Sequence, residues 1–204
     1  MTTILQEAAA GRTTILPWTV AQYHRAISTG LVPEDTACEL LDGFIVRKDR
    51  ATAGENPMTI GDRHRVAVLR LAHSARLFES HGCFLQTQQP ISLPPLNEPE
   101  PDGAVVRGQI DDYLEHPPIA SDLFCVIEVA DSSLSLDLGP KLRAYATACI
   151  PQYVVADLVN DRLLIHEEPS GDSYSRVTEL TRDATAHIRA GSGSVPIAVE
   201  YLIP

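Results

Sequence analysis

The chain has 204 residues, of which 44% are apolar, and it carries a formal net charge of -11 at pH 7. So acidic a chain repels polyanions, which argues against tight nonspecific nucleic-acid binding unless a basic patch or bound metal ions offset the field. It contains no apolar run of membrane-spanning length and no N-terminal run of signal-peptide length. We therefore expect a soluble cytoplasmic protein that does not bind membranes.

The periodic segments are not separated by Gly/Ser tracts or long charge runs, which predicts one domain over residues 1–204. Residues 1–18 are expected to form a flexible N-terminal segment. The cysteines occur singly, without the paired spacing of a zinc site, and at least Cys125 and Cys149 lie in apolar segments. Buried reduced thiols are expected rather than metal ligands or disulfides.

The N-terminal part predicts a helix followed by a hairpin. Thr-x-x-Gln at 19–22 is a capping-box pattern, and Gly30 is a common residue after the end of a helix. Asp-Gly at 42–43 separates two short apolar runs, which is a strong hairpin signal. Glu39 lies on the first predicted strand, where both a solvated carboxylate and a functional one fit the pattern.

A loop is predicted over residues 51–59, followed by a helix from residue 60 to about 81 with apolar residues at helical spacing. His64 and His73 lie on this helix, but neither has a second potential metal ligand at a diagnostic spacing. A polar surface histidine is therefore the favoured interpretation. Residues 84–93 are expected to form a strand that Pro90 interrupts.

Two further strands are expected at 103–107 and 123–129. The second is apolar at consecutive positions, which is typical of a strand covered on both faces. Glu128 lies near its end, and a buried carboxylate needs a cation, a donor or a metal beside it. A helix over 137–149 and a strand over 152–157 follow, and this order predicts a right-handed crossover between parallel strands.

The remaining segments complete a layered fold. Residues 162–167 and 174–180 are predicted to form a hairpin, and 195–203 a last strand or an extended segment. We expect an α/β (α+β) domain, with a mixed sheet flanked by helices and N-terminal helix and hairpin additions.

One group of charged residues is a candidate catalytic site. Asp102 and Glu128 each adjoin a predicted strand, so neighbouring strands would bring both carboxylates to one site. Two hard oxygen ligands suit Mg²⁺ or Mn²⁺ better than zinc, and Lys141 can add a positive charge from the next helix. Spacing alone supports equally a structural interpretation, in which Asp137 and Lys141 form a surface ion pair and Asp102 caps a turn.

Five motifs together resemble the Uma-two family, a group of predicted restriction endonucleases within the PD-(D/E)XK nuclease superfamily. They are Glu-Leu-Leu-Asp-Gly at 39–43, Glu-Pro-Asp at 100–102, Ile-Glu-Val-Ala-Asp-Ser-Ser-Leu at 127–134, Asp-x-x-x-Lys-x-x-x-Tyr at 137–145 and Ile-Pro-Gln-Tyr-x-Val-x-Asp at 150–157. The resemblance implies a restriction-endonuclease-like fold with Asp102 and Glu128 as metal ligands. It further implies the backbone carbonyl of Val129 as a third ligand and Lys141 as the catalytic lysine.

The chain departs from the family patterns at two places. The superfamily lysine stands two residues after the glutamate, where this chain has Ala130, so Lys141 must reach the site from the following helix, as in the Uma-two family. Gln152 and Val154 stand where the family usually has an acidic residue and a tryptophan.

The leading hypothesis is a magnesium- or manganese-dependent endonuclease that hydrolyses DNA phosphodiester bonds. Glu39 is expected to be an additional ligand or a water-positioning group, which adds it to the catalytic set of Asp102, Glu128 and Lys141. The alternatives are a catalytically silent nucleic-acid-binding or accessory protein and a hydrolase of a smaller phosphoester. Because cutting both strands of a duplex commonly uses two active sites, a homodimer is expected.

Overall fold

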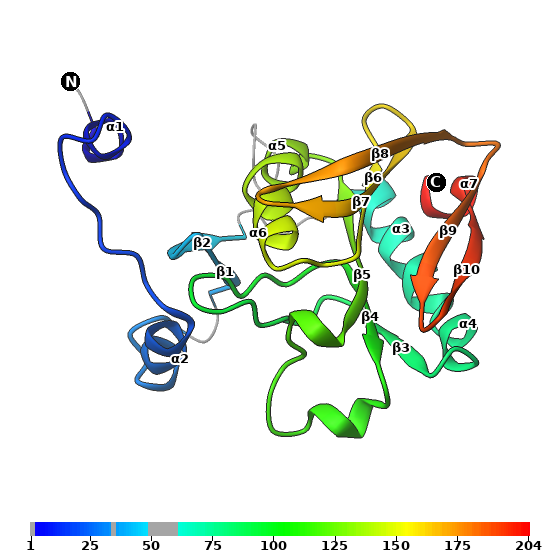
Figure 1. The fold of residues 1–204 in the computed structure, drawn as a ribbon, viewed down its shortest axis with the longest axis horizontal. Helices are drawn as coiled ribbons and strands as arrows, with labels where there is room; N and C mark the ends of the chain where they lie inside the picture. The colour runs from blue at the N-terminus through cyan, green and yellow to red at the C-terminus, as the bar shows by residue number, and fades with distance from the viewer. Residues whose placement is uncertain (1–2, 34–35, 49–60) are drawn as a thin grey trace.

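The structure is a computed structural model that describes residues 3–33, 36–48 and 61–204 (Figure 1). The loop predicted over 51–59 lies outside the described residues, as does the predicted helix start at residue 60. No helix in the described part of the chain is both long and apolar enough to cross a membrane.

A six-stranded mixed sheet forms the centre of the fold, and only β5 and β6 pair in parallel within it. This confirms the predicted mixed sheet and the parallel crossover. In spatial order the strands are β3 (Cys83–Gln86), β4 (Gly103–Arg107), β5 (Leu123–Ala130), β6 (Gln152–Asp157), β7 (Arg162–Ser170) and β8 (Ser173–Thr181).

The predicted N-terminal helix and hairpin are both present. Helix α2 (Val20–Ser28) begins with a complete capping box, in which the side chains of Thr19 and Gln22 each accept a bond from the other's backbone N–H. Strands β1 (Cys38–Leu41) and β2 (Phe44–Arg47) form the hairpin. Its two turn residues have φ of 50° and 76°, the positive values that a two-residue hairpin turn favours. A further helix, α1 (Ile4–Ala9), lies within the segment expected to be flexible.

A second hairpin near the C-terminus was only partly predicted. Strands β9 (Thr185–Ala190) and β10 (Gly193–Ala198) pair with each other, and α7 (Val199–Leu202) follows. The sequence predicted only a last strand or an extended segment over 195–203. Strand β9 alternates buried and exposed positions, but two of its three buried residues are alanines, which give a weak hydrophobic signal.

Both long helices predicted in the centre of the chain are divided. The first forms α3 (Asp62–His73) and α4 (Arg76–Glu79), with the break at Ser74, whose Oγ donates to the Leu71 carbonyl at 2.6 Å. The second consists of α5 (Leu134–Leu136), a π turn (Asp137–Lys141) and α6 (Leu142–Thr147). Short 3-10 turns, Ile110–Tyr113 and Ala120–Asp122, interrupt the loop between β4 and β5.

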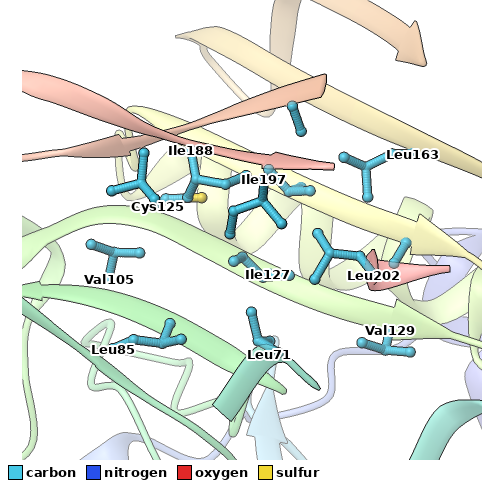
Figure 2. Packing of buried hydrophobic residues seen from close by; sticks show 14 of the residues in the cluster. Leu71, Leu85, Val105, Cys125, Ile127, Val129, Leu163, Ile188, Ile197 and Leu202 are labelled. Carbon is cyan, nitrogen blue, oxygen red and sulfur yellow. The ribbon is translucent and has the colours of Figure 1, made fainter. Parts of the chain in front are cut away.

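The sheet has a hydrophobic core on each face. One core includes side chains from α3, α7 and the β9–β10 hairpin, and Figure 2 shows Leu71, Ile127, Ile188 and Leu202 packed there. The other includes side chains from α6. From Cys125 onward, alternate residues of β5 enter opposite cores, which explains the unbroken apolar run and places Glu128 on the α6 face.

The cysteines confirm the thiol prediction except at one position. Cys38, Cys83 and Cys125 are buried and free, whereas Cys149 is free but exposed. Cys149 follows the end of α6 with φ of 59°, so it lies outside the helix that was predicted to extend to residue 149.

Candidate functional site

Glu128 is the buried centre of the candidate site. Its Oε1 accepts hydrogen bonds from Lys141 Nζ at 2.9 Å and from the Tyr145 hydroxyl at 2.7 Å. Burial raises the pKa of Glu128 to about 8, although the ammonium of Lys141 opposes the rise. The buried carboxylate therefore has the cation and the donor that its position on β5 requires.

Lys141 lies among three carboxylates and is only 5% exposed. Besides Glu128, its Nζ lies 3.5 Å from Glu39 Oε2 and 3.8 Å from Asp137 Oδ1. Burial lowers the pKa of Lys141, but the carboxylates more than offset this and raise it above the ordinary value. The alternative of a surface ion pair is wrong, because both Asp137 and Lys141 are buried.

The π turn explains how one helical segment directs three side chains at the same point. An α-helix has 3.6 residues per turn, so a residue four positions further along the chain lies about 40° past the first. A π turn is wider, so a residue four positions further along falls short of a full turn. Asp137 to Lys141 spans the π turn and Lys141 to Tyr145 the α-helix, so the two rotations oppose each other. Pro140 lies within the π turn.

Asp137 is held at the start of the π turn. Ser133 Oγ donates to Asp137 Oδ2 at 2.5 Å, and the Asp137 carbonyl accepts from the Tyr153 hydroxyl at 3.0 Å. Burial raises the pKa of Asp137 to about 6, against the opposing effect of Lys141. The carboxylate and the backbone carbonyl of Asp137 are therefore both held by hydrogen bonds, which fixes the segment that carries Lys141.

Asp102 connects three elements at the edge of the same cluster. It precedes β4, whose first residue, Gly103, pairs with Ile127 of β5. Its Oδ2 accepts from the Val129 backbone N–H at 2.9 Å and lies 3.3 Å from His64 Nε2. Burial raises the pKa of Asp102, but the bonds from His64 and Val129 outweigh it and the pKa is lowered. The carboxylate thus bridges β5 and α3.

The expectation that His64 is a polar surface residue is wrong. Its side chain is 17% exposed, and it faces Asp102 from the first turn of α3. Because its partner is 38 residues away in the sequence, no local spacing could indicate this contact. Tyr145 was likewise given no role, although its position four residues after Lys141 was a usable signal.

Glu39 belongs to the cluster as well, so the interpretation of a solvated carboxylate is wrong. It is buried on β1, and its Oε2 accepts from the Glu100 backbone N–H at 3.1 Å. An antiparallel bridge between Leu40 and Glu98 attaches β1 to the segment that leads to Asp102. The N-terminal hairpin thereby delivers its carboxylate to Lys141.

The donor types of the site, carboxylate and carbonyl oxygens, are those that a small hard cation takes. Hydrogen bonds from the described residues fall on one oxygen of each carboxylate, Asp102 Oδ2 and Glu128 Oε1. The Val129 carbonyl lies on the same edge of β5 as its N–H, which faces Asp102. Within the described ranges no group of three or more His, Cys, Asp and Glu side chains is arranged to hold a metal. Mg²⁺ is usually bound by one or two carboxylates and keeps several water ligands, so two carboxylates and a carbonyl are suitable ligand types.

Comparison with known proteins places the chain in a family. The family model Uma2, described as "Putative restriction endonuclease", matches residues 20–195. The chain belongs to the Uma2 family. This is the Uma-two family that its motifs resemble, and the match extends beyond the last of those motifs.

A solved structure has the fold of this Uma2 chain. It is the crystal structure of a protein from Anabaena variabilis ATCC 29413 that is described as a "putative nuclease belonging to DUF820". The two share 13% sequence identity with a TM-score of 0.61, over 91% of this chain and 97% of the other. No curated protein matches the chain.

The two departures of this Uma2 chain from the family patterns have local explanations. Ala130 is fully buried in the core on the α6 face, and the cation enters from Lys141 instead. Gln152 and Val154 point to the other face of the sheet. There Gln152 accepts from the Arg189 N–H and donates to the His187 carbonyl, which joins β6 to β9.

Proposed function

We propose that this protein is a metal-dependent endonuclease that hydrolyses DNA phosphodiester bonds. The observation that carries the proposal is the buried Lys141 ammonium 2.9 Å from Glu128 Oε1, in a cluster whose charges also act on Asp102. Two carboxylates and a lysine at the end of a central strand are the set that the family resemblance implies. The family description and the fold of the Anabaena protein support a nuclease.

Asp102, Glu128 and the Val129 carbonyl would hold Mg²⁺ or Mn²⁺. Such an ion supplies a Lewis acid and lowers the pKa of bound water. The charge balance supports the assignment, because one ammonium faces the carboxylates of Glu39, Glu128 and Asp137. The raised pKa of Glu128 and of Asp137 means that one ammonium does not fully compensate their ionised forms, and a divalent cation would supply further positive charge.

Lys141, Glu39 and Asp137 have different roles in the proposed reaction. Lys141 presents a fixed positive charge to a phosphoryl oxygen, where it stabilises the negative charge that grows as water attacks phosphorus. Glu39 Oε2 lies 3.5 Å from the same ammonium, and its role in the proposal is to orient water. Asp137 anchors the π turn through Ser133, so that Lys141 needs no rearrangement when substrate binds.

The chain's charge of -11 bears on the substrate. A polyanion approaches such a protein poorly, so metal occupancy is expected to strengthen DNA binding, and salt to weaken it steeply. Because cutting both strands of a duplex commonly uses two active sites, the proposal includes a homodimer. Both points are part of the proposal and are measurable by fluorescence anisotropy and by sedimentation.

A cleavage assay tests the function. Plasmid DNA, single-stranded DNA and small phosphoesters are each incubated with the wild-type protein in Mg²⁺, Mn²⁺ or EDTA. We expect metal-dependent cleavage of DNA that falls about a hundredfold in Lys141→Ala and in Asp102→Asn. Arg176→Ala is the control for the loss of one ion-paired cation, because Arg176 on β8 forms its ion pairs with Glu167 and Glu168 of β7 instead of with the cluster.

Each other outcome has a distinct meaning. DNA binding without cleavage in any metal would indicate the accessory protein. Turnover of small phosphoesters alone would indicate the smaller hydrolase. Full cleavage by Lys141→Ala would remove the lysine from the mechanism.

A further inference from the structure

The two carboxylates of the site share an unusual arrangement of donors. Glu128 Oε1 accepts from both Lys141 and Tyr145, and Asp102 Oδ2 accepts from the Val129 N–H and faces His64. In each case both partners converge on the same oxygen atom. The other oxygen of each carboxylate receives no hydrogen bond from the described residues.

A carboxylate held in this way has a fixed orientation. The terminal torsion of Asp and Glu is broad, so an unrestrained carboxylate exchanges its two oxygens readily. Two donors on one oxygen prevent that exchange and determine which oxygen remains available to a ligand. Residues that orient metal ligands in this way typically affect metal affinity by about 10- to 100-fold.

We propose that Tyr145 and His64 are positioning residues that each fix one oxygen of a carboxylate, leaving Glu128 Oε2 and Asp102 Oδ1 for a divalent cation. The inference rests on the proposed function, because it concerns the same metal site. Neither residue is assigned a role by the family motifs or by the comparisons.

Tyr145 is suited to this role by its surroundings. It is fully buried, and its ring packs against Tyr153 with ring centroids 4.8 Å apart. Its place on α6, one helical turn after Lys141, brings the hydroxyl to the oxygen that the ammonium also contacts. Removal of the hydroxyl alone would leave Lys141 as the single donor to Glu128 Oε1.

His64 has a matching position at the other carboxylate. Because Asp102 Oδ2 is an acceptor, a hydrogen bond at 3.3 Å requires the proton on His64 Nε2. The other ring nitrogen, Nδ1, is buried and has no partner among the described residues. The contact with Asp102 is therefore the polar interaction that the structure gives this ring.

The test measures Mn²⁺ binding by electron paramagnetic resonance on the full chain. We expect Tyr145→Phe to weaken Mn²⁺ binding by about 10- to 100-fold. Tyr174→Phe is the control, since it removes another buried tyrosine hydroxyl from the same core, one that donates to the Ile150 carbonyl at 3.0 Å. This control should bind Mn²⁺ like the wild type.

For the second residue, His64→Leu should weaken Mn²⁺ binding, whereas His64→Gln should bind Mn²⁺ with an affinity closer to that of the wild type. The amide nitrogen of glutamine can take the place of Nε2 as donor. Urea unfolding in EDTA is measured for every variant, and the two tyrosine variants are expected to lose similar stability. A change in metal affinity without a matching change in metal-free stability separates positioning from a structural role.

Two results would overturn the inference in distinguishable ways. If the wild type binds Mn²⁺ and the Tyr145→Phe and His64→Leu variants bind it equally well, positioning is refuted while the proposed metal site stands. If the wild type does not bind Mn²⁺ at all, the proposed metal site fails and the inference fails with it.

Discussion

Lys141 Nζ lies 2.9 Å from Glu128 Oε1 although the two residues are 13 positions apart, one on a helical segment and the other on a central strand. The strand itself offers only Ala130 on the same face two residues later, and it is fully buried. The cation therefore enters the site from the helix layer rather than from the sheet. Its removal should affect the stability of the fold as well as any activity.

We expect Lys141→Met to lower the free energy of unfolding by about 3 kcal/mol in EDTA, because it leaves buried carboxylates without their cation. Lys48→Met is the matched control. Lys48 and Glu100 are 18% and 35% exposed, so their pair should contribute at most about 1 kcal/mol. Urea titrations followed by circular dichroism give both values. Equal losses in the two variants would mean that the cluster does not depend on its lysine.

Divalent metal should stabilise the protein by mass action. At Mg²⁺ or Mn²⁺ concentrations 100 times the dissociation constant, the gain is about 2.7 kcal/mol, which a thermal melt detects as a higher Tm. The double variant Asp102→Asn with Glu128→Gln should lose this gain. Glu98→Gln controls for the loss of a buried carboxylate, because Glu98 pairs with His24 instead of Lys141. A metal-induced shift that persists in the double variant would exclude these two residues as ligands.

The hairpin that delivers Glu39 depends on Gly43. A Cβ at this position would lie 2.2 Å from Pro17 Cβ, and φ is 76°. We expect Gly43→Ala to destabilise the protein by more than Gly171→Ala. Gly171 also has a positive φ, but its Cβ would meet nothing within 4 Å, so it isolates the backbone cost of about 1–2 kcal/mol. Chemical denaturation compares the two, and equal effects would show that the Pro17 contact relaxes without cost.

Asp157 should make the stability depend on acid pH. Burial raises its pKa, but the bonds from Asn160 and Arg162 outweigh this and hold the pKa below the ordinary 3.8. A lowered pKa means that the unfolded chain binds the proton more readily, so this stabilisation is present above pH 3.8 and is lost as the pH falls through the folded value. Asp157→Asn should therefore be less stable than the wild type at pH 7.

The difference in free energy of unfolding between the wild type and Asp157→Asn should become smaller as the pH falls toward 2. Urea titrations at several pH values can follow this difference. Asp172→Asn, in the exposed turn between β7 and β8, controls for the loss of one negative charge. If the difference in free energy of unfolding stays constant from pH 7 to pH 2, the stabilisation by Asp157 does not depend on its ionisation.

The sequence predicted those parts of the fold that local pattern determines. The Asp-Gly turn at 42–43, the capping box at Thr19 and the apolar run of β5 each contain their own signal, and all are confirmed. The break at Ser74 was missed because its cause is one side-chain bond to a carbonyl. Strand β9 was missed because its core positions are mostly alanine.

The candidate site was predictable to a lesser extent. Asp102, Glu128 and Lys141 were identified from motifs. In the structure, Lys141 donates a hydrogen bond to Glu128, and Asp102 precedes β4, the strand that pairs with β5. Whether they bind metal remains a prediction. The contact of His64 with Asp102 depends on how α3 packs against the sheet, which no pattern within α3 reveals.

The cluster around Lys141 also determines when the site can exist during synthesis. Glu39, Asp102 and Glu128 leave the ribosome before Lys141, and the strand that pairs in parallel with β5 follows later still. Until the helical segment docks, the carboxylates have no ammonium between them, so their mutual repulsion opposes early assembly. A nascent chain therefore carries these carboxylates before it carries the ammonium that separates them, and the sheet is completed by β6, β7 and β8 only after Lys141 has been made.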